Sequence, residues 1–579
     1  MLARLFMPQD ISHRPLNIQW RIQWGIGLGV SLLFAFFYGC LAMQKGFSGD
    51  YVVQDDARHY LFWMERFRDA SAFPNDLIAD YLQAIAPVGY KFFYRLASYG
   101  HLSPEWLAKV LPTGLGMVAA GYYYGLTLAI FPVPLAGVMA SVMLSQHLWC
   151  TDDLVSASPR SFIYPLVIPL LFYFVRRQWG LSLLFLGLLA LFYPSVALVA
   201  ATLYGVHAVD WQKLPGLWRC PWRALVMGRC WVAIAALTLT LLCILPTYLL
   251  SHDYGPVVTL AQAHTIPELQ PSGRHAFFRT GPSRYWLMLY GGHGAILKRT
   301  LFTPITLAAA LFLWPMLLRR RRFPSLNAVQ PTVYVLAELT LAAMIWFFLA
   351  YGVAFRLHLP GRYTSHCIQL AVPILAAIAW VSLLDSGGLQ RRRLRQWLVA
   401  GLILVPLLFY YPLLLKNFPK TLYMAGHEGP IYQYLQTQPQ ASLVASLDYE
   451  ADNLPTFAKR SVLMAPEYGT PFHLGYYRQM RQRATDLLAA HYAADKATVK
   501  TFADTYGVDF WLVHRAAFTP DYLANHRYWS NNYSSPLLQP AIDQMEQGTV
   551  GVLQTNLDRC AVVETANFWL VPMDCVLGD

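Results

Sequence analysis

Residues 24–43 have the sequence WGIGLGVSLLFAFFYGCLAM, an apolar run of the length that an α-helix needs to cross a bilayer. The whole chain has 579 residues, of which 56% are hydrophobic and 13% are charged. A soluble domain carries about 25% charged residues, so this chain has about half the usual share. The sequence therefore predicts a polytopic α-helical membrane protein.

Similar apolar runs recur as far as residue 415. The other stretches expected to form full membrane helices are residues 107–131, 135–149, 162–175, 231–250, 301–318, 333–355, 364–384 and 398–415. The run 181–206 is too long for one helix, and Tyr193-Pro194 interrupts it. Because proline removes a backbone donor, two short helices are expected there. The total is about eleven membrane helices, two of them short.

Basic residues lie in short segments between the apolar runs and account for the net charge of +12. No nucleic-acid motif accompanies them, so a nucleic-acid partner is not expected. The rule that basic loops face the cytoplasm orients the chain in the plasma (inner) membrane. It predicts a cytoplasmic N-terminus (1–23), a membrane domain (24–415) and an extracytoplasmic C-terminal domain (416–579). The outward loops are then 44–106, 151–161, 251–300 and 356–363.

The C-terminal region has the pattern of an α/β domain. Strands are expected over 441–447, 461–465 and 508–514, and helices over 476–492 and 496–506. Alternating strands and helices favour a small sheet with flanking helices. The segments 453–460 and 466–477 carry aromatic residues that could stack on sugars or simply pack as ordinary loops.

Cys560 and Cys575 flank a segment that is expected to form a hairpin turning near Asn567. The hairpin would bring the two cysteines opposite one another. A disulfide is expected between them if this segment lies outside the cytoplasm, and free thiols if it does not.

Two pairs of adjacent acids follow membrane helices. Asp55-Asp56 begins an amphipathic stretch expected to lie along the membrane interface. Charges at a membrane face are costly unless they are solvated or used. Asp152-Asp153 lies in the next outward loop, ahead of Arg160. The alternatives are that Asp55 caps its helix and that the second pair belongs to an ordinary polar loop.

Several basic residues are expected to face outward, against the general pattern: Arg274, Arg356, His358 and Arg362. Arginine binds phosphate through two parallel hydrogen bonds, so an anionic lipid-linked substrate is one explanation. The alternative is that these residues pair with the acids for structural reasons or contact lipid phosphates.

This organisation resembles the GT-C superfamily of membrane glycosyltransferases. The shared features are the acidic pair and interfacial helix of the first loop, the acidic pair of the second, the helices around Tyr193-Pro194 and the outward C-terminal domain. Residues 55–82, DDARHYLFWMERFRDASAFPNDLIADYL, also resemble a stretch of uncharacterised bacterial membrane proteins. The C-terminal domain has no WWD-like motif of oligosaccharyltransferases, which argues against an N-glycan ligase.

The resemblance implies that a sugar passes from a polyprenyl-phosphate carrier to an unidentified acceptor at the outer face of the membrane. The catalytic candidates are Asp55, Asp56, Asp152 and Asp153, with His59 and His358 as nearby polar residues. The candidates for phosphate binding are Arg160, Arg274, Arg356 and Arg362. One carboxylate would act as general base, or Asp55 and Asp56 would hold a divalent metal. The alternative functions are a lipid or polysaccharide transporter and a non-catalytic protein of envelope assembly.

Overall fold

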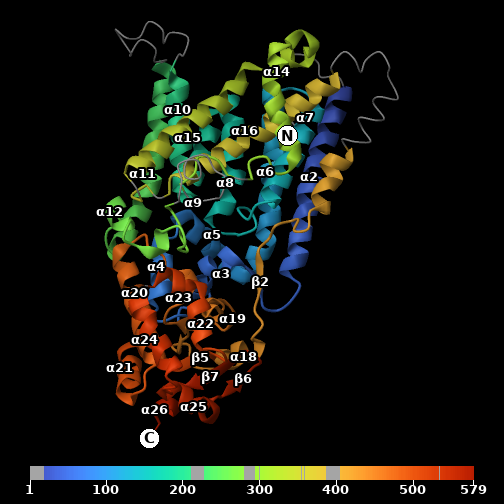
Figure 1. Ribbon diagram of the computed structural model, residues 1–579. Coiled ribbons are helices and arrows are strands. Elements are labelled where there is room, and N and C mark those ends of the chain that lie inside the picture. The colour runs from blue at the N-terminus through green and yellow to red at the C-terminus, as the bar shows by residue number, and fades with distance from the viewer. Residues whose placement is uncertain are drawn as a thin grey trace.

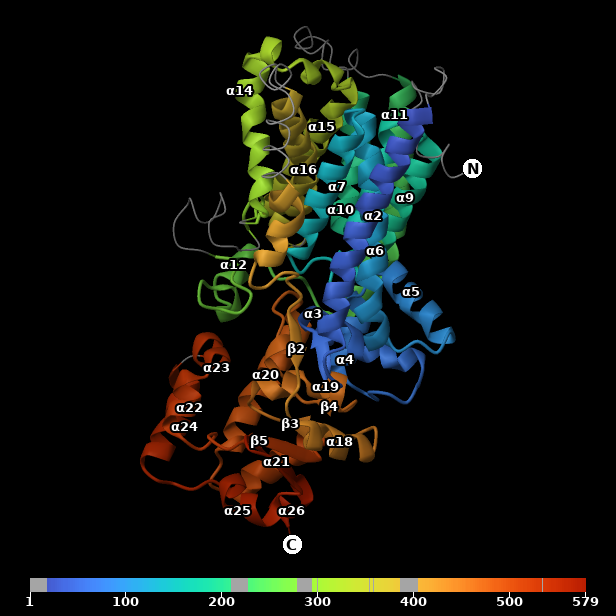
Figure 2. The same cartoon turned by 90° about the vertical axis from the view of Figure 1, so that its right-hand side faces the viewer.

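The computed structural model describes residues 18–209, 227–278, 294–298, 300–353, 355–357, 359–385, 405–533 and 535–578. A bundle of long helices forms one half of the molecule, and the C-terminal residues form the other half around a small sheet (Figure 1). Between them lie the short helices α3, α4 and α5 of the first loop (Figure 2). The expected combination of apolar helices with a C-terminal α/β region is confirmed.

The helical half is apolar both inside and on its surface. Its helices are α2 (Ile18–Gly46), α6 (Pro104–Ile130), α7 (Pro134–Trp149), α8 (Ile163–Val175), α9 (Trp179–Phe192), α10 (Pro194–Ala208), α11 (Met227–Leu250), α15 (Tyr334–Gly352) and α16 (Gly361–Asp385). Trp231 and Leu242 on α11 are 67% and 64% exposed, as side chains that face lipid would be. The protein is therefore an integral membrane protein.

The count of eleven membrane helices is not established. Among the described residues, four helices are long and apolar enough to span a membrane: Arg21–Gly46, Gly228–Pro246, Pro331–Gly352 and Gly361–Asp385. The predicted span 301–318 is instead a 3-10 segment, η8 (Ile305–Phe312), followed by α14 (Leu313–Leu318). Of the predicted span 398–415, residues 398–404 lie outside the described part. The helix break at Tyr193 is confirmed, because α9 ends and α10 begins there.

The first loop forms secondary structure of its own. Its elements are β1 (Val52–Gln54), α3 (Asp55–Leu61), the 3-10 segment η2 (Phe62–Phe67), α4 (Leu77–Ile85) and α5 (Val88–Tyr99). β1 pairs antiparallel with β2 (Tyr423–Ala425), with Val53 opposite Met424. The first loop is thus joined by backbone hydrogen bonds to the segment that leads into the C-terminal region.

The C-terminal sheet has the strand order β4-β3-β5-β7-β6. Its strands are β3 (Leu443–Ala445), β4 (Ser461–Val462), β5 (Phe510–His514), β6 (Val563–Glu564) and β7 (Phe568–Pro572). β4, β3 and β5 are parallel, and β7 runs antiparallel to β5 and β6. The main flanking helices are α20 (Leu474–His491) and α21 (Lys496–Tyr506). The three predicted strands and both predicted helices are present.

One hydrophobic core contains both the first loop and the C-terminal region. Trp63 and Tyr81 from the first loop are buried in the same cluster as Trp511 and Tyr476. The rings of Tyr81 and Tyr476 stack with centroids 3.7 Å apart. Packing therefore unites segments that the sequence analysis assigned to different domains.

The structure joins Cys560 and Cys575 by a disulfide. The hairpin between them is β6–β7, with Val563 opposite Leu570. The cysteines themselves lie on the flanking helices α25 (Val552–Cys560) and α26 (Met573–Leu577), not on the strands.

Candidate active site

The two acidic pairs meet through one arginine. Asp56 lies in the first turn of α3, and Asp152 and Asp153 follow the end of α7. Arg160, on the 3-10 segment η3 (Pro159–Phe162), contacts the carboxylate of Asp56 directly. Its guanidinium nitrogens also lie 3.4 Å from Asp152 Oδ2 and 3.5 Å from Asp153 Oδ1. Loops far apart in the sequence thus build one cluster, which we call the Arg160 cluster.

The start of α3 is capped by Gln54, whose side chain accepts a hydrogen bond from the backbone of Ala57. The suggestion that Asp55 serves as the cap is therefore wrong. Both acids lie in the first turn, where the helix dipole favours negative charge. Their side chains have different partners, because Asp55 pairs with Arg58 at 2.9 Å while Asp56 pairs with Arg160.

Asp153 is the buried member of the Arg160 cluster, with its side chain 2% exposed. Lys298 Nζ lies 2.7 Å from its Oδ2, and His366 Nδ1 lies 3.8 Å away. Burial by itself raises the pKa of the Asp153 carboxyl, but the Lys298 ammonium, through its charge and its hydrogen bond, outweighs burial and holds that pKa below its usual range. Asp153 is therefore an ionised, firmly held carboxylate.

Asp56 and Asp152 are accessible, with side chains 31% and 29% exposed. Burial and the neighbouring Asp153 raise the pKa of Asp152, while Lys420 and Lys298 offset part of this rise. A carboxylate whose pKa is raised toward neutrality is a stronger base than an ordinary one. The Arg160 cluster thus contains two accessible carboxylates, Asp56 and Asp152, and one buried carboxylate, Asp153, that is held by its ion pair.

Polar side chains continue from the Arg160 cluster between the apolar helices. The Tyr164 hydroxyl lies 3.2 Å from His366 Nδ1 and donates to Gln369 Oε1 at 2.7 Å. Tyr193, at the break between α9 and α10, accepts from Arg362 at 3.1 Å and lies edge-on to His366. Buried polar groups are costly among membrane helices, so such a network indicates a functional site.

The sequence analysis did not identify Lys298, His366, Gln369 or Tyr164. His366 and Gln369 are three residues apart on α16, so they share one face of an otherwise apolar helix. That spacing was the available signal. Lys298 carried none, because it is a single basic residue in a long loop.

A second ionic cluster lies where the first loop meets the C-terminal region. Arg58 donates to Asp55 and, at 2.6 Å, to Asn453 Oδ1, and lies 3.7 Å from Glu467. Arg274 contacts Glu467 directly. We call this group the Glu467 cluster. It links the first loop, the 251–300 loop and the C-terminal region.

Two further groups of the Glu467 cluster have shifted pKa values. Asp452 is buried, and its carboxylate accepts from the backbone of Glu467 at 2.8 Å. Burial and the nearby Glu467 charge raise the pKa of Asp452 well above its usual range. Burial, together with the Arg274 and Arg58 charges, lowers the pKa of His59 to about 3. His59 is therefore neutral and stacks on Tyr468, with ring centroids 4.8 Å apart.

The predicted phosphate-binding residues have different surroundings. Arg160 is surrounded by three carboxylates, Arg274 is paired with Glu467, and Arg362 is bonded to Tyr193. Arg356 is exposed, and no described residue forms an ion pair with it. His358 lies outside the described residues. Arg160 and Arg362 lie close enough for their charges to act on one another, whereas Arg274 belongs to the Glu467 cluster.

The acidic pairs offer carboxylate oxygens as possible ligands for a divalent metal. Carboxylate oxygens suit magnesium and manganese. Asp55 and Asp56 have different cationic partners, however, and the Arg160 guanidinium contacts the oxygens that a metal would need. Among the described residues, no three His, Cys, Asp or Glu side chains form a group able to hold a metal ion. The arrangement does not fit a metal site.

The fold and the Arg160 cluster define an integral membrane protein with a carboxylate-rich site between a helical bundle and an α/β region. No protein-family model matches the chain, and no curated protein matches its sequence.

Solved structures of the oligosaccharyltransferase of Archaeoglobus fulgidus share this fold. The apo form has a TM-score of 0.53 and 12% identity, covering 89% of this chain and 72% of the other. The complex of AglB from that organism with an inhibitory peptide and a dolichol-phosphate has a TM-score of 0.52 and 13% identity, covering 90% and 72%. The complex with Zn and sulfate has a TM-score of 0.50 and 12% identity, covering 89% and 70%. At these identities the likeness shows the fold alone.

Proposed function

We propose that the protein is a membrane glycosyltransferase of the GT-C type. It moves a sugar from a polyprenyl-phosphate carrier to an acceptor at the outer face of the plasma (inner) membrane. The observation that carries the proposal is the contact of Arg160 with Asp56 and Asp152, two accessible carboxylates from separate loops. The shared fold supports it, because one solved oligosaccharyltransferase complex contains a dolichol-phosphate.

In this proposal Asp152 acts as general base. It takes the proton of the acceptor hydroxyl as that oxygen bonds to the anomeric carbon of the sugar. The bond between the sugar and the carrier phosphate breaks, and its electron pair leaves with the phosphate. Asp56 orients the acceptor. Arg160 is a positioning residue, because it holds the carboxylates together and limits their mutual repulsion.

The test is a transfer assay with the full-length protein in proteoliposomes and a polyprenyl-phosphate sugar. Asp152→Asn should lose most transfer, because asparagine has nearly the same shape but cannot accept the proton. Asp56→Asn should also lose most transfer, because it removes the charge that pairs with Arg160 and with it the carboxylate that orients the acceptor. Glu564→Gln is the matched control, since Glu564 is a surface acid whose side chain is 52% exposed. Full activity of both aspartate variants would overturn the proposal. Lipid movement without transfer would indicate a transporter instead.

A further inference from the structure

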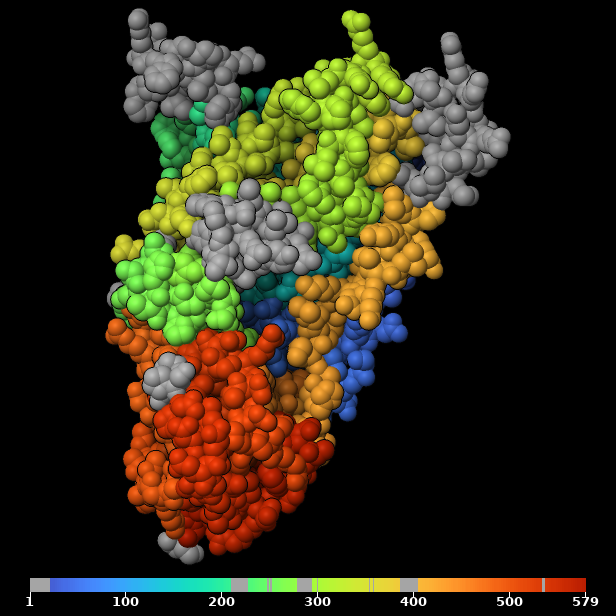
Figure 3. Space-filling view, viewed as in Figure 1, coloured from blue at the N-terminus to red at the C-terminus, as the bar shows by residue number. Residues whose placement is uncertain are grey.

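A pocket of about 370 Å³ lies where the chain leaves the helical bundle for the C-terminal region. Its wall includes Lys45 at the end of α2, Cys150 just after α7, and much of the segment 415–423. This segment runs down the flank of the molecule (Figure 3, orange). Because Cys150 and Asp152 are two residues apart, the pocket adjoins the Arg160 cluster.

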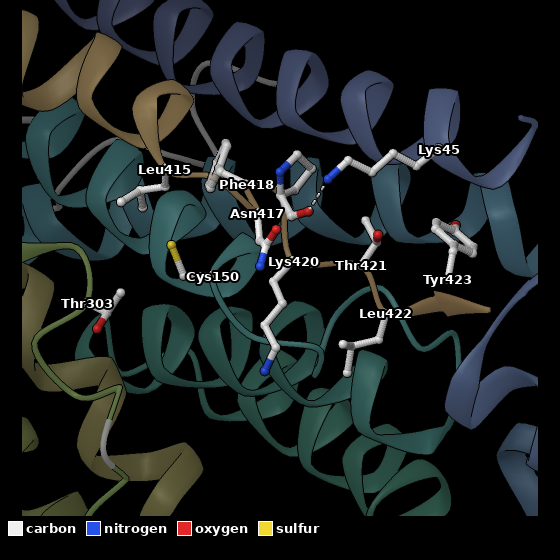
Figure 4. Close-up of a pocket in the computed structure, with 11 residues that line it drawn as sticks. Lys45, Cys150, Thr303, Leu415, Asn417, Phe418, Lys420, Thr421, Leu422 and Tyr423 are labelled. Carbon is white, nitrogen blue, oxygen red and sulfur yellow. Dashed lines mark hydrogen bonds between the residues drawn. The ribbon is translucent and has the colours of Figure 1, made fainter. Parts of the chain in front are cut away.

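The pocket contains an unpaired cation. Lys420 is exposed, and its ammonium has no hydrogen-bond or ion-pair partner among the described residues. Its backbone is fixed, since the Lys420 amide donates to the Trp149 carbonyl at 2.7 Å. Lys45 does have a partner, because its ammonium donates a hydrogen bond to the Pro419 carbonyl at 2.7 Å and so holds the segment in position. The Lys420 side chain extends away from Lys45, with Asn417 beside it (Figure 4).

The other described cations near the Arg160 cluster already have partners. Arg160 contacts three carboxylates and Lys298 contacts Asp153. Arg362 donates to the neutral hydroxyl of Tyr193 and is only half-buried, whereas Lys420 is exposed. A departing phosphate needs a positive charge that is not already neutralised. Lys420 meets that need and acts electrostatically on Asp152.

An exposed apolar surface leads to the pocket. Leu414 is 68% exposed and Tyr410 is 58% exposed, just before the segment that forms the pocket wall. This surface continues onto α2, because Phe409 and Phe34 pack with ring centroids 4.8 Å apart and Phe37 on α2 is 41% exposed. A lipid tail can lie on this surface while its headgroup reaches Lys420.

We propose that this pocket binds the phosphate of a lipid-linked phosphate monoester, with Lys420 and Asn417 as its ligands and Lys45 as a positioning residue. The identification of that monoester as the polyprenyl phosphate released when the sugar is transferred rests on the proposed function, since the loaded carrier is a diester. Phosphate recognition itself does not. A phospholipid headgroup would share the phosphate chemistry but is a diester with a single negative charge.

The experiment measures binding of farnesyl phosphate to the full-length protein in detergent micelles by thermophoresis. Lys420→Ala should raise the Kd about tenfold through loss of a charge-assisted contact, and Lys420→Arg should restore most of the affinity. Lys416→Ala is the matched control, because Lys416 is a nearby exposed lysine outside the pocket wall. It should leave the Kd within about twofold. An unchanged Kd in Lys420→Ala would overturn the proposal.

Binding of three other ligands shows which part of farnesyl phosphate the pocket recognises. Farnesol should bind at least about tenfold more weakly than farnesyl phosphate, and inorganic phosphate should compete only weakly. Farnesol binding as tightly as farnesyl phosphate would overturn phosphate recognition. Phosphatidylglycerol competing as well as farnesyl phosphate would overturn the monoester assignment.

Failure of this proposal can be told apart from failure of the proposed function. If farnesyl phosphate binding depends on Lys420 but the protein transfers no sugar, the glycosyltransferase assignment is wrong and the phosphate site stands. If the protein transfers sugar but the Kd for farnesyl phosphate does not depend on Lys420, only the assignment of the phosphate site is wrong. Asp152→Asn should keep farnesyl phosphate binding, because it removes a negative charge near Lys420.

Discussion

The guanidinium of Arg160 and the carboxylate of Asp56 are in direct contact although 104 residues separate them in the chain. This contact joins the first loop to the loop that carries Asp152 and Asp153. With Arg160 in place, three carboxylates share one site without strong repulsion.

Replacing Arg160 should reduce transfer activity more than it reduces the stability of the fold. Arg160→Gln removes the charge that holds Asp56 and Asp152 together, so transfer should fall by about 100-fold or more, as when a preorganised charge is lost. Arg160→Lys keeps the charge without the planar fork and should retain intermediate activity. Arg515→Gln is the control, because Arg515 forms an exposed pair with Glu564 in the C-terminal region, and equal losses in Arg515→Gln and Arg160→Gln would contradict the prediction.

Asp153 should matter for stability through its partner Lys298. Asp153→Asn leaves the Lys298 ammonium without its carboxylate, so the free energy of unfolding should fall by about 2–4 kcal/mol. Lys298→Gln removes the same pair from the other side. Because the two residues are in contact, the double variant should cost less than the sum of the single variants. Thermal unfolding in detergent measures all three, and strictly additive losses would contradict the ion pair.

The Glu467 cluster should stabilise the packing of the C-terminal region against the first loop. Glu467→Gln removes the charge that faces Arg274 and Arg58, which should lower the free energy of unfolding by about 2 kcal/mol. Limited proteolysis should then cut between the two regions faster. Glu564→Gln breaks only an exposed pair with Arg515 and should cost less than about 1 kcal/mol. Equal proteolysis of both variants would show that the core alone holds the two regions together.

Asp452 should make stability depend on pH. An acid whose folded pKa is raised contributes stability that is fully present below its unfolded pKa, near 3.9, and is lost as pH rises through the folded pKa. Asp452→Asn keeps an oxygen to accept from the Glu467 backbone but cannot ionise. The difference in unfolding midpoint, variant minus wild type, should therefore grow between pH 5 and pH 9. A difference that is constant or shrinks over this range would contradict the raised pKa.

The disulfide between Cys560 and Cys575 should stabilise the C-terminal region. It closes a loop with a sequence separation of 15 residues, for which loss of chain entropy predicts about 3 kcal/mol. The Cys560→Ser/Cys575→Ser variant should unfold at a lower temperature, and reductant should lower only the wild-type midpoint. Peptide mapping of the protein purified from membranes tests whether the bond forms in the cell. A fully reduced pair there would argue against an oxidising compartment for this region.

Local patterns predicted the secondary structure well. The helix break at Tyr193-Pro194 and helix α21 followed from proline chemistry and apolar spacing. The span 301–318 was mispredicted as one regular helix, because hydropathy ignores the missing backbone donors of Pro304 and Pro315. The joint core of Trp63 and Trp511 was missed because it forms between distant segments.

The sequence by itself determined that this is a membrane protein with a C-terminal α/β region and acids at the ends of its helices. Apolar run length and strand periodicity are local properties, so they can be read without coordinates. Only the tertiary structure decided which charges meet. It placed Arg160 between Asp56 and Asp152, paired Arg274 with Glu467, and left Lys420 without an ion-pair partner among the described residues. Ion pairing depends on distances of a few ångströms between remote segments, which no local pattern encodes.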